Sequence, residues 1–90
     1  QRIEPGLLAH EPMVLWARAA AATTYGDVVE LCRMYDIEPP VVDEVPRIQT
    51  ILALVASGAG IALLPTSFIN LSRSGVRFVP LQGRLPQRPL

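Results

Sequence analysis

The spacing of apolar positions changes partway through the segment 48–65, and that change predicts a helix followed by a strand. The first apolar side chains recur at the spacing of one helix face, at Ile48, Ile51, Leu52 and Val55. Gly58 and Gly60 follow, and glycine readily adopts the conformation that ends a helix. A continuous apolar run then stops at a proline, as expected of a strand covered on both faces. We therefore predict a helix over residues 47–57 and a strand over residues 60–65.

The remaining patterns predict three more strands and two more helices. Short runs rich in β formers predict strands over residues 13–18, 41–45 and 76–81. Helices are predicted over residues 25–35 and 66–71. The apolar face of the first of these helices is predicted at Tyr25, Val28, Val29 and Cys32. The order β-α-β-α-β-α-β indicates an α/β fold, with a mostly parallel sheet flanked by helices and joined by right-handed crossovers.

Composition limits the size of the protein and the partners that it can have. Ninety residues allow one small domain, and a hydrophobic content of 50% suggests that some apolar surface meets another domain or subunit. The net charge is zero and no long charge run exists, which gives no support for nucleic-acid or membrane binding. No apolar stretch approaches the ~20 residues of a membrane span. Cys32 is the single cysteine, so an intrachain disulfide is excluded and a cytoplasmic location is favoured. Its place on an apolar helix face indicates a buried thiol rather than a nucleophile.

An acidic residue, a helix face, two glycines and a proline follow one another at fixed offsets. The series consists of Glu44, Gln49-Thr50-Ile51-Leu52, Leu54-Val55, Gly58, Gly60-Ile61-Ala62 and Leu64-Pro65. This series resembles the effector-binding (substrate-binding) domain of LysR-type transcriptional regulators. Residues 11–16 and 76–81 resemble the strands that precede and follow that core in the family, so the resemblance spans nearly the whole chain. One departure is Ala17, where the family often has proline.

The resemblance implies one lobe of a domain like the type II periplasmic binding proteins. Residues 1–90 would form a single α/β subdomain, the second of two, with residues 1–12 and 84–90 crossing to a first subdomain outside this sequence. The protein would be a bacterial, cytoplasmic homo-oligomer that binds a small-molecule effector between its lobes. It would contact DNA only through an N-terminal winged helix-turn-helix, also outside this sequence. The alternative is a lobe of a periplasmic-type solute-binding protein, because the two classes share this fold.

Candidate ligand-binding residues lie where the predicted strands end and the next helices begin. Ligands of doubly wound sheets bind beyond the carboxyl ends of strands, near helix N-termini. This rule and the resemblance give Trp16, Ala17, Arg18, Ala19, Glu44, Val45 and Gln49. Arg18 would pair with a carboxylate effector, or else be a solvated loop arginine. Trp16 would cover a ligand or pack in the core, and packing is favoured; Glu44 faces either the cleft or open solvent.

No pattern of catalytic or metal-binding residues is found. Asp43 and Glu44 are neighbours in a predicted strand, so their side chains face opposite sides and cannot act on one bond. His10 has no second candidate ligand nearby, so no metal is expected. Ser57 and Ser67 lack the sequence setting of a hydrolase nucleophile. We therefore predict a protein that is not an enzyme and that needs no cofactor.

Overall fold

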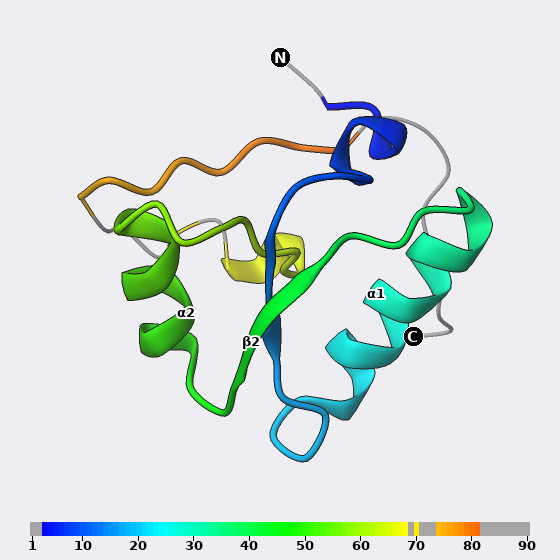
Figure 1. The fold of residues 1–90 in the computed structure, drawn as a ribbon. Coiled ribbons are helices and arrows are strands. Elements are labelled where there is room, and N and C mark those ends of the chain that lie inside the picture. The colour runs from blue at the N-terminus through cyan, green and yellow to red at the C-terminus, as the bar shows by residue number, and fades with distance from the viewer. Residues whose placement is uncertain (1–2, 69, 71–73, 82–90) are drawn as a thin grey trace.

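The fold is a pair of parallel strands with a helix on each side (Figure 1). The computed structural model describes residues 3–68, 70 and 74–81. Its main elements, in chain order, are β1 (Met13–Trp16), α1 (Ala22–Met34), β2 (Val41–Val45) and α2 (Ile48–Ala56). Two short 3-10 helices, η1 (Pro5–Leu8) and η2 (Thr66–Phe68), precede and follow these elements. In Figure 1, α1 and α2 lie on opposite sides of the strand pair, as a doubly wound α/β arrangement requires.

The two long helices and the first two strands confirm the sequence prediction. The bounds of β2 agree with it, and those of α2 differ by one residue at each end. The largest difference is at α1, which begins at Ala22 rather than at Tyr25. Alanine has the highest helix propensity of any residue, so the helix starts within the alanine run. Of the predicted helix over residues 66–71, Thr66–Phe68 form the 3-10 turn η2 and Asn70 lies in a turn, while residues 69 and 71 lie outside the described residues.

The predicted strand over residues 60–65 meets the sheet at one position only. Ile61 bridges Met13 in parallel; its N–H donates to the carbonyl of Pro12 at 2.9 Å, and its carbonyl accepts from Val14 at 2.8 Å. β1 therefore lies between β2 and Ile61, and the continuous strand predicted here is wrong. β1 is only four residues long, and Pro65 has no N–H to donate, so few ladder positions are left for this segment.

The predicted strand over residues 76–81 is also wrong as a regular element. Its described contact with another extended segment is a parallel bridge between Leu81 and Ile3. In this bridge the N–H of Ile3 donates to the carbonyl of Pro80 at 3.0 Å. Proline contributes a carbonyl to such a pair but no N–H, so the pairing does not extend as a ladder. The segment runs beside the N-terminal part of the chain without becoming a sheet strand.

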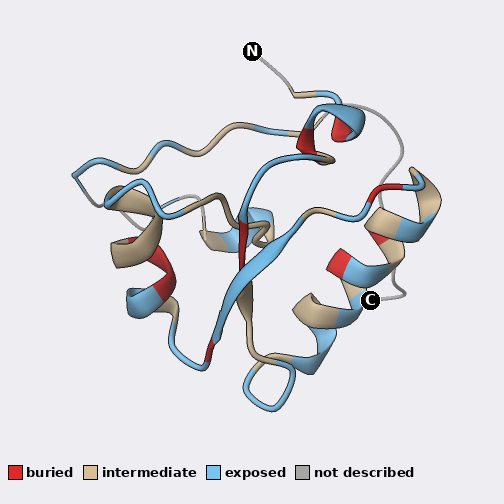
Figure 2. Ribbon diagram, viewed as in Figure 1, coloured by how far each residue is buried: buried red, intermediate tan, exposed pale blue. Residues whose placement is uncertain are grey.

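The core lies between the two strands and α2. Val14, Val45 and Ile51 form its buried centre. Half-buried apolar side chains surround that centre, namely Trp16, Ile48, Leu54, Val55, Ala62 and Leu64. Figure 2 shows buried residues on β1, at the end of β2 and along the inner side of α2. The predicted apolar face of α2 is thus confirmed.

The buried face of α1 differs from the predicted face by one position. Val28 and Leu31 are buried, whereas Val29 is 53% exposed. Residues three apart share a helix face and adjacent residues do not, so Leu31 joins Val28 and Val29 turns outward. Including Val29 in the buried face is therefore wrong, and α1 presents an apolar side chain to solvent.

The end of α2 is set by the first of the two glycines, Gly58. Gly58 has a φ of +87°; its N–H donates to Val55 and that of Ala59 donates to Leu54, both at 3.0 Å. This pair of hydrogen bonds is the Schellman motif, so the predicted glycine stop is confirmed. Gly60 has a different role. A Cβ atom there would lie 2.6 Å from the carbonyl oxygen of Pro12, so the two backbones approach too closely for a side chain.

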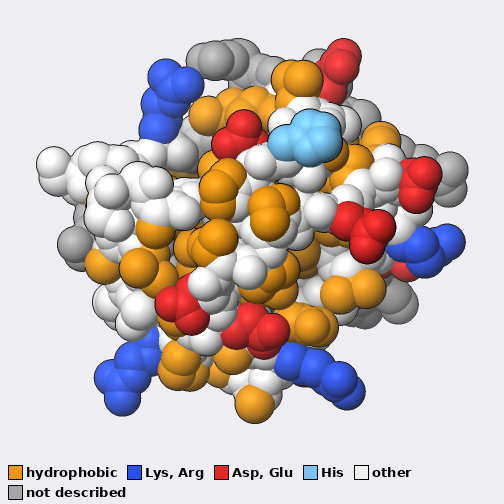
Figure 3. All heavy atoms as spheres, viewed as in Figure 1, with side chains coloured by type: hydrophobic (Ala, Val, Ile, Leu, Met, Phe, Trp, Pro, Cys, Tyr) orange, Lys and Arg blue, Asp and Glu red, His pale blue; other side chains and the backbone are white. Residues whose placement is uncertain are grey.

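Charged side chains of both signs lie on the surface of the described residues. On the face seen in Figure 3, acidic and basic side chains are spread among hydrophobic ones. Across the part of the chain that the structure describes, no helix is both long and apolar enough to cross a membrane.

Candidate functional site

The carboxyl ends of β1 and β2 meet at one edge of the sheet, because the strands are parallel. Trp16 pairs in register with Val45, and the N–H of Ala17 donates to the carbonyl of Val45 at 2.7 Å. Both strands reach the lower edge of the molecule as drawn in Figure 1. The structure therefore brings these three predicted site residues together, while their contact with a ligand stays a prediction.

The other four predicted residues lie on the surface around this edge. All four are exposed, and they are Arg18, Ala19, Glu44 and Gln49. Arg18 and Ala19 occupy the turn after β1, which is closed by a hydrogen bond of 3.0 Å from the N–H of Ala21 to the carbonyl of Ala17. The guanidinium of Arg18 is therefore available to an anion from solvent.

Trp16 is held in place by two contacts. Its Nε1 donates to the carbonyl of Pro46 at 3.1 Å. Its ring meets that of Phe68 edge to face, with centroids 5.3 Å apart and an interplanar angle of 77°. The side chain is half-buried against the core, which is the packing role that the sequence favours. Val45 is only 7% exposed, so its side chain also belongs to the core.

The first turns of both long helices add backbone donors near the strand ends. The N-cap residues, Ala21 for α1 and Arg47 for α2, make no side-chain hydrogen bond to their helices. The free N–H groups of a helix N-terminus carry a partial positive charge. Together with Arg18, this edge of the molecule offers donors suited to a carboxylate, and it also carries the exposed carboxylate of Glu44.

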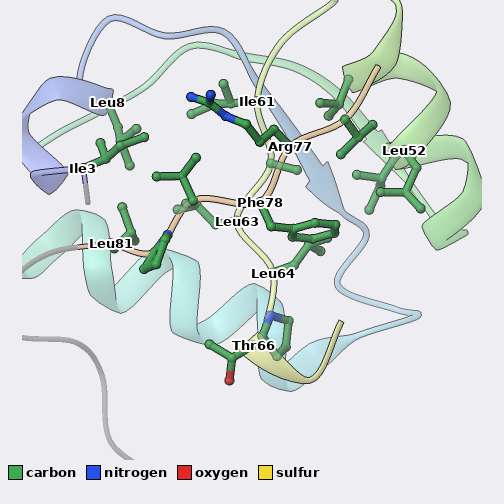
Figure 4. Close-up of a pocket in the computed structure, with 17 residues that line it drawn as sticks. Ile3, Leu8, Leu52, Ile61, Leu63, Leu64, Thr66, Arg77, Phe78 and Leu81 are labelled. Atoms are coloured by element: carbon green, nitrogen blue, oxygen red, sulfur yellow. The ribbon is translucent and has the colours of Figure 1, made fainter. Parts of the chain in front are cut away.

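A separate apolar cavity borders the core (Figure 4). It has a volume of about 300 Å³ and lies between α2, the segment 61–66, the segment 76–81 and the N-terminal residues. Labelled side chains in Figure 4 include Leu8 and Leu81 near one end and Leu52 near the other. None of the seven predicted site residues lines it.

Sequence reasoning missed this cavity for a physical reason. Apolar periodicity identifies the segments 61–64 and 76–81, and it predicts that both join the sheet. Instead each pairs through a single bridge, and space remains between them and α2. The signal in the sequence is Pro80 in one segment and Pro65 after the other, because each removes an N–H from a possible ladder.

Three side chains of α1 have shifted pKa values, and each shift has a structural cause. Arg33 donates to Glu30 through its Nε at 2.9 Å, and this bond lowers the pKa of the Glu30 carboxyl. The same bond raises the pKa of the Arg33 guanidinium. Cys32 is half-buried, and desolvation raises the pKa of its thiol, so the thiol stays protonated at neutral pH. Among the described residues, no group of three His, Cys, Asp or Glu side chains is placed to hold a metal.

The family match and the individual relatives agree with each other. The whole chain, residues 1–90, matches the family described as LysR substrate binding domain. YnfL, an uncharacterized HTH-type transcriptional regulator of Escherichia coli (strain K12), is 35% identical over 74 residues, which cover 82% of this chain and 25% of YnfL. IlvR, an HTH-type transcriptional regulator of Caulobacter vibrioides, is 38% identical over 74 residues, with the same two coverages. TfdS, an HTH-type transcriptional regulator of Cupriavidus pinatubonensis, is 35% identical over 91 residues, which cover 99% of this chain and 31% of TfdS.

The match covers only part of each relative. The chain spans about a quarter of the length of the curated relatives that it matches first. No solved structure shows a significant match. The family consists of regulators and not of enzymes, which confirms the prediction from the residues. The chain belongs to the LysR-type transcriptional regulators, as part of their effector-binding domain.

Proposed function

We propose that this chain is the second lobe of the effector-binding domain and supplies one wall of a cleft for a small metabolite. The observation that carries the proposal is the register of β1 and β2, which places Trp16, Ala17 and Val45 at one edge beside exposed Arg18. In α/β sheets, ligands bind beyond this edge. The first 12 residues and residues 84–90 would then cross to the other lobe, in the manner of type II periplasmic binding proteins.

The proposed ligand is a small carboxylate. The guanidinium of Arg18 would bind both carboxylate oxygens, and the partial positive charge at the starts of α1 and α2, whose N-cap side chains make no capping hydrogen bond, would favour a negative charge. Trp16 would form part of the apolar wall through its half-buried ring. Glu44 would repel a second carboxylate, so the edge selects ligands whose other end is neutral or positive.

Regulation would follow from closure of two lobes on the ligand. A ligand shifts a conformational equilibrium only as far as it binds one state better than the other. One wall alone gives little difference between states, because half of the contacts are missing. In the complete regulator, lobe closure would reposition an N-terminal winged helix-turn-helix on DNA. The relatives' description as HTH-type transcriptional regulators supports such a DNA-binding part. We accordingly place the protein in the cytoplasm.

The cleft is tested by calorimetry with a panel of aromatic and aliphatic carboxylates. We expect saturable binding by a two-lobed protein that carries these ninety residues as one lobe. Replacing Arg18 by alanine should weaken that binding by about 10–100-fold, because loss of this hydrogen-bonded charge pair costs about 1.5–3 kcal/mol in total.

The matched control is Arg33→Ala. It removes the same charge from an exposed arginine in the last turn of α1, away from the proposed cleft, and should leave the dissociation constant unchanged. Tight binding by the ninety residues alone, or equal losses in the two variants, would contradict the two-lobe proposal.

The free edge of β2 is the proposed dimerisation surface. Among the described strands, β2 pairs only with β1, and Val41 and Val42 on it are 51% and 53% exposed. A register shift in the pairing between Met13 and Val14 leaves Val42 as an extra residue, and such bulges discourage regular strand addition. We therefore propose contact through these side chains rather than through a continuous intermolecular sheet.

The alternative function is a lobe of a periplasmic-type solute-binding protein. The shared lobe fold favours it, since the same strand edge would bind the solute. A gene that begins with a secretory signal would support this alternative, and one that begins with a winged helix would exclude it.

A further inference from the structure

We propose that the apolar cavity between α2 and the segments 61–66 and 76–81 binds a small uncharged apolar molecule about the size of one aromatic ring. This site is separate from the strand-edge cleft and shares no residue with it. The proposal therefore goes beyond the cleft function and does not depend on it.

The cavity is large enough to hold one aromatic ring. An apolar cavity of about 150 Å³ is enough to bind benzene, and ligand pockets begin at about 300 Å³. The cavity here has a volume of about 300 Å³, so a single ring with a short substituent fits within it.

The walls of the cavity are mostly apolar. The lining side chains that are buried are all aliphatic, namely Leu8, Ile51 and Leu52. The structure describes no buried polar or charged side chain, and the polar lining residues Thr66 and Arg77 are exposed. A charged group placed between the aliphatic side chains would lose its hydration, and the cation of the lining, Arg77, is exposed to solvent rather than set among them. The walls therefore select an uncharged ligand.

The segment 76–81 forms one wall of the cavity and is not held by a strand ladder. Its Phe78 lies between this wall and Leu52 of α2 (Figure 4), and Val79 also lines the cavity. A ligand between this wall and Leu52 would contact both and would stabilise the chain by binding only its folded form. The cavity is partly open to solvent, which gives the ligand a way in.

The experiment uses the full chain and toluene as the probe. We expect a saturable rise in Tm of at least about 2 °C. Methyl NMR should show intermolecular contacts from toluene to side chains on both walls, including Leu52, Val55 and Val79. Benzoate has the same ring with a charge, and it should give no such contacts.

A matched pair of variants locates the site. Leu63 lines the cavity, and Leu63→Trp should fill it and abolish the rise in Tm. Leu7 is 68% exposed and does not line the cavity, so Leu7→Trp should leave the rise unchanged. Should the first variant fail to fold, the wild-type NMR contacts still decide the question.

Three results would overturn the proposal. They are an unchanged Tm at the solubility limit of toluene, NMR contacts confined to another surface, and full binding by folded Leu63→Trp. Benzoate contacts at Trp16 and Arg18 would instead report on the cleft, so the two sites are tested independently.

Discussion

Gly60 is the residue at which backbone approach leaves no room for a side chain. A Cβ atom at this position would lie 2.6 Å from the carbonyl oxygen of Pro12, which itself accepts the N–H of Ile61. A side-chain carbon and this hydrogen bond cannot both be accommodated without movement of one backbone. The residue thus permits the bridge between Ile61 and Met13 that gives β1 a neighbour on its second side.

Substituting Gly60 by alanine should destabilise the fold. We expect a loss of about 1–3 kcal/mol in the free energy of unfolding, the usual cost of an inserted carbon that forces the backbone to shift. Urea unfolding followed by circular dichroism measures this loss.

Gly26→Ala is the matched control. Gly26 lies within α1, and a Cβ atom there would meet nothing within 4 Å. Alanine should stabilise the helix by about 0.5–1 kcal/mol. Equal effects of the two substitutions would show that close approach at Gly60 has no energetic consequence.

At the scale of elements, α2 packs against both strands through one fully buried residue. Ile51 is fully buried at 0% exposure and contacts Val14 and Val45, whereas Ile48, one turn earlier, is half-buried. This difference between two residues of one type makes a direct comparison possible within one helix.

Ile51→Ala should cost about 2–5 kcal/mol, because it removes transfer energy and leaves a cavity. Ile48→Ala should cost clearly less, since solvent can fill the space that it leaves. Chemical unfolding of both variants checks the order, and an equal loss would show that α2 is not anchored through Ile51.

The sequence predicts α2 well because its apolar positions follow one helical period and end at glycines. The predictions for residues 60–65 and 76–81 are wrong because an apolar run shows which side chains avoid water, not which partner will supply hydrogen bonds. Those two segments depend on contacts between distant parts of the chain. The prediction that Val29 is buried is wrong for a related reason. Apolar residues lie on more than one side of α1, so the sequence allows more than one choice of buried face.

The candidate site also has a part that the sequence predicts and a part that it does not. Parallel strands oblige their carboxyl ends to meet, so Trp16, Ala17 and Val45 are found together. The orientation of exposed side chains such as Arg18 depends on what they bind, and their role stays a prediction. The apolar cavity arises from a mismatch between segments, which no local pattern describes.

At the scale of the whole molecule, association should depend on the edge of β2. Val42→Lys should raise the dissociation constant of a dimer by at least about tenfold, because an unpaired lysine buried there would cost about 1.4 kcal/mol or more. Sedimentation velocity over a range of concentrations measures the change.

Leu7→Lys is the control for association. Leu7 is 68% exposed in η1, outside β2, so its replacement should leave the dissociation constant as it was. A wild-type chain that remains monomeric at high concentration would contradict the proposed surface.

The hydrogen bond between the N–H of Ile3 and the carbonyl of Pro80 places two residues that are far apart in the sequence side by side. The stretch of chain between two such adjacent points could be transferred from one host protein into a loop of another without stretching either. Exchange of such cassettes would let one scaffold acquire new ligand preferences in a single genetic step.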